Sequence, residues 1–238
     1  MKEIALVLSF VITFSVIAMF FIDRIDNNIA EVINAVSDEK RIIVLDAGHG
    51  GEDGGCVAFD GTEEKSINLR IVNDIAALFD IFGIDYVFTR TDDNSIGDLS
   101  LPTIRKRKNS DIMKRYEIVN SYDNSILLSI HQNMFPVEKY YGTQVFYSAA
   151  FSEAEELASE IQNTVKFNLQ TDNMRKIKPS DSSIYLLYNA KRPSVMVECG
   201  FMSNLNELTL LKDNVYQKQI AYFITKGLYR FLLSKKDV

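Results

Sequence analysis

The chain contains only two histidines, and each lies close behind an apolar run of strand-forming residues. His49 follows IIVLDA-G and His131 follows SILLSI, while a third apolar run, SVMV, ends at Glu198. Ligands of an open α/β sheet bind beyond the carboxyl ends of its strands, so we expect these three side chains to meet at one edge. Imidazole and carboxylate groups suit zinc, and three protein ligands leave a fourth position for water.

A helix expected at 63–82 supplies a further carboxylate. Its apolar stripe includes Ile67, Ile71 and Ile75. At about 100° per residue, Glu64 lies within roughly 20° of the centre of that stripe and Glu63 about 80° from it. We therefore predict Glu64 as the third metal ligand. The alternative is that these acids only complement the helix dipole, and it applies above all to Glu63.

Charge narrows the classes of partner. The chain has 238 residues and a formal net charge of −6, so a phosphate backbone would repel it and we expect no nucleic-acid partner. The glycines of HGGEDGG at 49–55 resemble a phosphate-binding loop only superficially, because no G-K-[ST] follows them. They predict a tight loop around a metal instead.

Five other polar residues lie near these segments in the sequence. Cys199 is expected to point to the sheet face opposite Glu198 as a buried thiol, and Cys56 to fill the loop near the first histidine. Asn133 either contacts substrate or closes a turn. Arg90 and Arg115 are expected to form structural ion pairs.

Short apolar runs alternate with amphipathic segments from Arg41 onward, a pattern typical of a largely parallel sheet flanked by helices. We predict one α/β domain over 41–238 with a twisted sheet. The expected strands are 41–47, 86–90, 125–130, 143–147 and 194–197, and the expected helices are 63–82, 109–122, 153–169 and 214–233. Ser152 and Glu155 form an S-x-x-E pattern that predicts a capped start for the third helix.

The amino-terminal segment is strongly apolar. Residues 4–22 carry no charge and would span roughly 28 Å as a helix at about 1.5 Å per residue, enough to cross a hydrocarbon core. We predict a transmembrane or signal-anchor segment over 1–22, joined by a linker at 23–40 to a domain on the extracytoplasmic face of the membrane. A cleaved signal peptide is the alternative, although no A-x-A site follows.

Four motifs in order resemble the zinc-dependent N-acetylmuramoyl-L-alanine amidases of the Amidase_3 family. They are DAGHGGEDGG at 46–55, EK at 64–65, SIHQN at 129–133 and VECGFMSN at 197–204. The resemblance implies that His49, Glu64 and His131 hold Zn²⁺ and that Glu198 is the catalytic acid/base. It implies a peptidoglycan substrate, cut between the lactyl group of N-acetylmuramic acid and L-alanine. Gln132 departs from the family, which often has Ala or Val there.

An anchor followed by one catalytic domain is similar to the sporulation-associated members of this family, as are the segments GTQVFYS and VYQKQIA. That resemblance implies action on spore cortex around the forespore, as the first step toward muramic-δ-lactam. It also leaves room for an accessory protein that serves localisation, metal retention or activation. Two alternatives stay open: a zinc peptidase of the stem peptide, and a membrane-tethered scaffold that binds peptidoglycan with an inactive metal site.

Overall fold

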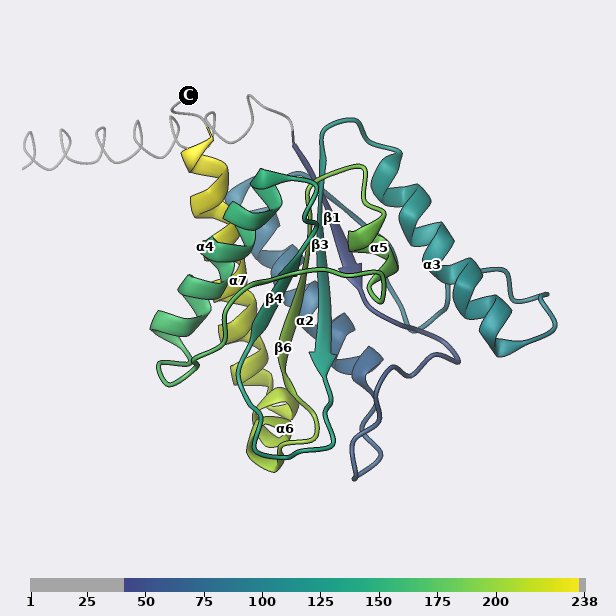
Figure 1. The fold of residues 1–238 in the computed structure, drawn as a ribbon, viewed down its shortest axis with the longest axis horizontal. Helices are drawn as coiled ribbons and strands as arrows, with labels where there is room; N and C mark the ends of the chain where they lie inside the picture. Colours follow the sequence, from purple (N-terminus) through teal and green to yellow (C-terminus); the bar gives the residue numbers. More distant parts are fainter. Residues whose placement is uncertain (1–40, 236–238) are drawn as a thin grey trace, which may run out of the picture. The chain divides into compact units, whose positions relative to one another are not determined.

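Six strands form one sheet in the order β2-β1-β3-β6-β4-β5 (Figure 1). The computed structural model describes residues 41–235. The strands are β1 (Ile42–Ala47), β2 (Tyr86–Phe88), β3 (Ser125–Asn133), β4 (Gln144–Tyr147), β5 (Lys178–Pro179) and β6 (Ser194–Phe201). The pairs β1–β2, β1–β3, β3–β6 and β4–β5 are parallel, and only β4–β6 is antiparallel. The predicted α/β class with a largely parallel sheet is confirmed.

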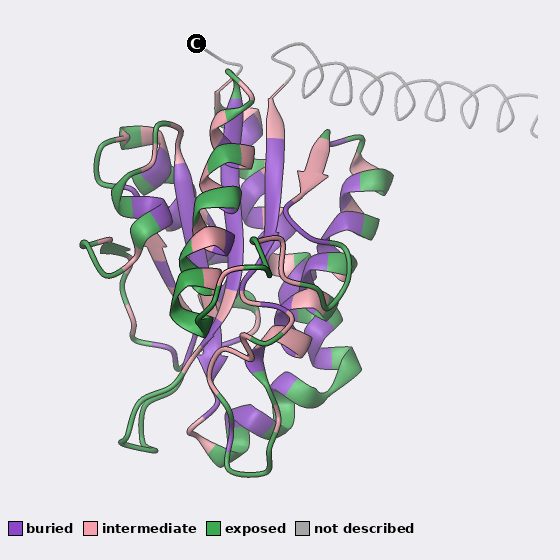
Figure 2. Cartoon of the chain, turned by 90° about the vertical axis from the view of Figure 1, so that its right-hand side faces the viewer, coloured by how far each residue is buried: buried purple, intermediate pink, exposed green. Residues whose placement is uncertain are grey.

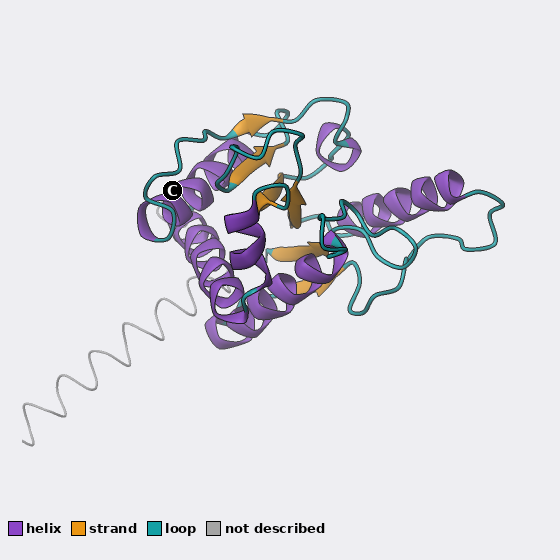
Figure 3. Ribbon diagram, turned by 90° about the horizontal axis from the view of Figure 1, so that it is seen from below, coloured by secondary structure: helices purple, strands orange, loops and turns teal. Residues whose placement is uncertain are grey.

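Helices cover both faces of this sheet (Figure 3). They are α2 (Glu64–Phe82), α3 (Ile104–Asn120), α4 (Ser152–Asn168), α5 (Tyr185–Tyr188), α6 (Leu205–Lys212) and α7 (Asn214–Ser234). Helices α2, α4 and α7 pack together on one face, which we call the three-helix face. Helices α3 and α5 lie on the other, which we call the two-helix face.

Alternation along the strands decides which residues reach each face. Val44, Leu127 and Met196 belong to the apolar cluster under α3 and α5. Because neighbouring side chains in a strand point to opposite faces, Asp46, two residues after Val44, lies on the two-helix face as well. By the same count Ser129, His131 and Glu198 share that face. Most strand residues are buried, because both faces are covered (Figure 2).

Two strands continue past their predicted ends. The apolar pattern ends at Ile130 and Val197, but β3 runs to Asn133 and β6 to Phe201. His131 pairs directly with Glu198 across the two strands. Both residues are therefore held by the sheet itself, which fixes their backbone more firmly than a loop would.

Helix boundaries show where polar sequence misled the prediction. Helix α3 begins at Ile104 rather than near 109, and the Thr103 hydroxyl accepts a hydrogen bond from the Lys106 amide. The predicted Ser152 cap is wrong: Ser152 is the first helical residue, and Phe151 occupies the cap position without a side-chain hydrogen bond. The short elements β5, α5 and α6 were not predicted, because too few residues carry their pattern.

No helix among residues 41–235 is long and apolar enough to cross a membrane. The predicted anchor at 1–22 and linker at 23–40 lie outside the described residues, so both stay predictions.

Candidate metal centre

Three side chains from separate elements meet at the end of the sheet. His49 follows β1, Glu64 opens α2 and His131 lies in β3, and one ligand atom from each falls within 4.8 Å of the others. Glu64 Oε1 lies 3.3 Å from His49 Nε2 and 3.0 Å from His131 Nδ1. Two imidazoles and a carboxylate fit zinc in both ligand type and number. The predicted convergence of His49 and His131 from the strand ends, and of Glu64 from the helical stripe, is confirmed.

Glu64 is fixed from several directions. It is 3% exposed, and its carboxylate accepts hydrogen bonds from the amides of Cys56 and Gln132 and from the Asn68 side chain. Burial alone would raise the pKa of Glu64, but bonds to His131 and His49 lower it far below its usual value. It is an anion in position to bind a cation. Glu63 instead pairs with Lys65 at the surface, as the helical stripe indicated.

The glycine loop lets the backbone pass close to the ligands. His49 has a φ of 65°, and Gly55 has a φ of 71°. A Cβ on Gly55 would lie 2.5 Å from Glu64 Oε2, and one on Gly48 would lie 2.2 Å from the His131 ring. Any side chain at either glycine would displace Glu64 or His131, so the tight loop expected from HGGEDGG is confirmed.

Asp53 orients the first histidine. Its Oδ2 lies 2.9 Å from His49 Nδ1, which leaves His49 Nε2 directed toward Glu64. Burial alone would lower the pKa of His49, but Asp53 and Glu64 raise it to about 9. A carboxylate on the second nitrogen of a ligating histidine fixes the ring and strengthens its basicity. The sequence reasoning missed Asp53, because spacing within a glycine-rich loop does not predict which side chain turns inward.

A buried ionic cluster ties the first-histidine loop to the two-helix face. Arg115 of α3 pairs with Asp46 and Asp111, and it donates to the carbonyl oxygens of Ala47 and His49. Burial alone would raise the pKa of Asp46, but Arg115 and neighbouring groups lower it well below its usual range. The prediction that Arg115 is a structural ion-pair residue is confirmed.

Glu198 differs from Glu64 in having a buried carboxylate oxygen without a partner among the described residues. Its Oε2 is buried and makes no hydrogen bond within residues 41–235. Burial raises the pKa of Glu198 to about 7; His131 opposes this rise and Glu64 adds to it. A carboxyl that titrates near neutral pH beside a metal centre can both accept and release a proton.

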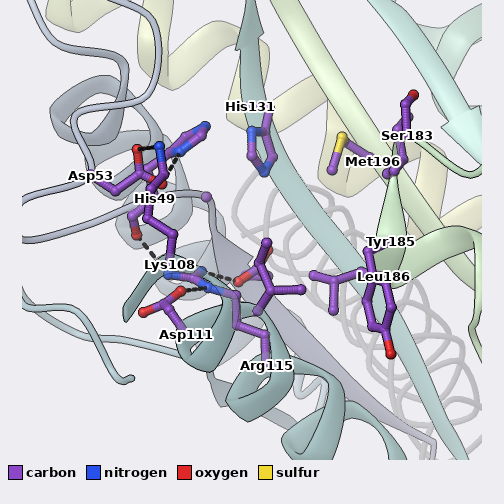
Figure 4. Close-up of a pocket in the computed structure, with 14 residues that line it drawn as sticks. His49, Asp53, Lys108, Asp111, Arg115, His131, Ser183, Tyr185, Leu186 and Met196 are labelled. Atoms are coloured by element: carbon purple, nitrogen blue, oxygen red, sulfur yellow. Dashed lines mark hydrogen bonds and ion pairs between the residues drawn. The ribbon is translucent and has the colours of Figure 1, made fainter. Parts of the chain in front are cut away.

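A cavity of about 240 Å³ opens beside the two histidines. Figure 4 shows α3 residues such as Lys108 and Arg115 on one side of it and the Ser183–Leu186 segment on the other, with His49 and His131 at one end. A reactant in this cavity would reach the metal centre from the two-helix face.

Comparison with known proteins fits this geometry. The Amidase_3 family, described as N-acetylmuramoyl-L-alanine amidase, matches residues 43–230. The chain belongs to this family. The amidase is 32% identical to the germination-specific N-acetylmuramoyl-L-alanine amidase of Bacillus subtilis, over 97% of this chain and 96% of the relative. The resemblance found from the four motifs is therefore confirmed.

Solved structures agree. The CwlD amidase from Clostridioides difficile, determined in complex with the GerS lipoprotein, is 40% identical with a TM-score of 0.77, covering 80% of this amidase and 98% of that chain. The amidase AmiC2 of Nostoc punctiforme is 28% identical with a TM-score of 0.68, covering 81% and 97%.

The remaining predicted residues of the amidase lie near the centre in different settings. Cys199 is fully buried, and by strand alternation it faces away from Glu198, as predicted. The Cys56 thiol lies 3.3 Å from the Met202 sulfur, so its side chain packs within the loop. Gln132 is buried, and its side-chain amide donates a hydrogen bond to the Asn68 side chain.

Asn133 ends β3, and its backbone carbonyl accepts a hydrogen bond from the Met202 amide. Its contact with substrate stays a prediction. Arg90 differs from its prediction, because it donates to backbone carbonyls rather than to a carboxylate.

Proposed function

We propose that this amidase is zinc-dependent and hydrolyses the amide between the lactyl group of N-acetylmuramic acid and L-alanine of the peptidoglycan stem peptide. The observation that carries the proposal is the pairing of a three-ligand cluster with an unpartnered carboxyl on the adjacent strand. His49, Glu64 and His131 would hold the zinc, and Glu198 would be the catalytic acid/base. The bound zinc would supply Lewis-acid activation of water and of the scissile carbonyl.

Glu198 would then act first as a general base and afterwards as a general acid. In the ionised form it takes a proton from the attacking water, and in the protonated form it delivers that proton to the departing amine of L-alanine. A pKa of about 7 makes both forms accessible near neutral pH. Asp53 holds His49 in one orientation throughout, and Asn133 at the end of β3 is a further contact proposed for the substrate.

Product analysis tests the chemistry. The full-length protein with added zinc is incubated with purified peptidoglycan, and the products are identified by mass spectrometry. Free stem peptides that begin with L-alanine, beside intact glycan strands, are expected. Fragments cut within the stem would favour a peptidase instead, and no cleavage by folded, zinc-loaded protein would favour a scaffold that binds without turnover.

We further propose a role in spore cortex, as the first step toward muramic-δ-lactam. Support comes from the similarity to the germination-specific amidase of Bacillus subtilis and to CwlD of Clostridioides difficile. Deletion of the gene in a spore-forming host should remove muramic-δ-lactam from the cortex. Normal lactam levels would contradict this role.

We also propose an accessory protein for localisation, metal retention or activation, because the similar amidase from Clostridioides difficile was solved with a lipoprotein. Zinc stoichiometry and turnover of the isolated chain test the last two roles. Full zinc occupancy and activity without a partner would make them unnecessary.

For localisation, we propose that the apolar segment 4–22 anchors the enzyme, or directs its secretion, at the extracytoplasmic face of the membrane, around the forespore in a spore-former. Amino-terminal sequencing of the protein from native membranes tests the anchor. A mature protein that begins beyond residue 22 would contradict it.

A further inference from the structure

The cavity beside the histidines has an apolar floor and one accessible cation. Ile112, Leu186 and Met196 supply apolar lining between α3 and α5. Two cationic side chains, Lys108 and Arg115, reach it. Arg115 is 3% exposed and is paired with buried carboxylates, whereas Lys108 is 44% exposed. Lys108 is therefore the cation that a molecule entering the cavity would meet.

The Lys108 ammonium group can bind a second acceptor in addition to Asp53. Within residues 41–235 its one ion pair is with Asp53 Oδ1, at 2.8 Å. An ammonium group carries three donors, so two are free for a second acceptor. Asp53 in turn lies 2.9 Å from His49, which places Lys108 one side chain away from the metal ligands. A substrate carboxylate bound by Lys108 would therefore lie close to the amide that is cleaved.

The shape of the substrate decides which part enters. The glycan is a continuous strand that leaves the scissile bond in two directions, so it needs an open surface. The stem peptide is a branch that leaves in one direction and fits between α3 and the Ser183–Leu186 segment (Figure 4). Its second residue is acidic and follows L-alanine, so at about 3.3–3.6 Å per extended residue its carboxylate lies within reach of Lys108.

We propose that this cavity is the stem-peptide subsite and that Lys108 binds the carboxylate of the second stem residue. The inference rests on the amidase function proposed above. A chain of net charge −6 otherwise repels anionic peptides, so a single exposed ammonium at this place favours stems with a free carboxylate over stems in which it is amidated. Lys108 is then a specificity-determining residue.

The test compares two soluble muropeptides that differ only at this group. The full-length, zinc-loaded enzyme is assayed with N-acetylmuramoyl-L-alanyl-D-glutamate and with the corresponding D-isoglutamine compound. We expect the wild-type enzyme to prefer the free acid by about fivefold in kcat/KM, the size of a partly exposed charged contact. Lys108→Gln should bring this ratio near one, chiefly through KM for the acid, and Lys108→Arg should restore part of it.

Controls separate specificity from damage to the metal centre. Lys114 lies on the same helix, is exposed and pairs with Glu117. The Lys114→Gln variant should therefore keep the wild-type ratio. Zinc content of Lys108→Gln should equal that of wild type, which shows that Asp53 still holds His49.

Two outcomes would overturn the inference in distinguishable ways. If both muropeptides are cleaved but the wild-type ratio is one, or if Lys108→Gln leaves the ratio unchanged, the subsite is wrong and the amidase function stands. If wild type cleaves neither muropeptide nor peptidoglycan, the proposed function fails and the subsite falls with it.

Discussion

The two faces of the sheet are built in opposite ways. On the three-helix face, α4 and α7 approach so closely that a Cβ on Gly227 would lie 2.6 Å from the Ile161 Cα. On the two-helix face, α3 buries the charged pair Asp111 and Arg115 beside apolar Val119, and α5 is a single turn beside a cavity. The first face gives the strands a rigid support, and the second leaves room for substrate and for charge. His131 and Glu198 point to the second.

The largest expected effect on stability lies on the two-helix face. Asp46→Asn leaves Arg115 buried without its strand partner, and breaking a buried ion pair costs about 3–5 kcal/mol of unfolding free energy. The same loss should appear in acid. The native pKa of Asp46 is depressed, so its contribution is present above its unfolded pKa of about 3.9 and is lost as pH falls below it.

Urea unfolding of wild type and Asp46→Asn between pH 3 and 7 checks this. The gap between the two should be widest near neutral pH and narrow toward pH 3. An equally stable variant at pH 7 would show that the ionic cluster is not what holds this face.

A smaller effect is expected on the three-helix face. Gly227→Ala would force α7 away from the backbone of α4, and overpacking of this kind costs about 1–3 kcal/mol. Turnover per folded molecule should stay at the wild-type value, because no residue of the metal centre moves. Gln219→Ala, an exposed substitution on α7, is the matched control. A loss of turnover in a stably folded Gly227→Ala variant would mean that packing on the three-helix face controls the metal centre.

A third effect concerns metal binding at the edge where the faces meet. Despite burial, Asp53 and Glu64 raise the pKa of His49 to about 9, so zinc binding to this residue, as proposed, would displace a proton at pH 7. Zinc affinity should therefore rise about tenfold per pH unit between pH 6 and 8 through this group. Chelator competition measures it, and Asp53→Asn should flatten the dependence. An affinity independent of pH would contradict the role given to the His49–Asp53 pair.

Sequence alone predicted the parts of this site that follow from regular elements. His49, His131 and Glu198 were predicted to lie at this edge because apolar strands end there, and Glu64 because a helical stripe fixes its direction. Asp53 and Lys108 were not found, because their roles depend on a loop path and on where α3 meets that loop. The Ser152 cap failed for a related reason: a local motif is overruled when the preceding chain enters the helix one residue earlier.

Glu64 and Glu198 are given different roles, and substitution of each carboxylate separates metal binding from proton transfer. Zinc content and turnover on peptidoglycan are measured for wild type, Glu64→Gln and Glu198→Gln, with folding checked by circular dichroism. Glu64→Gln should lose both zinc and turnover. Glu198→Gln should keep its zinc and lose turnover by about 10²–10⁴-fold, the range for removal of a general acid/base. Wild-type turnover in Glu198→Gln, or full zinc content in Glu64→Gln, would contradict the assignment of the two carboxylates.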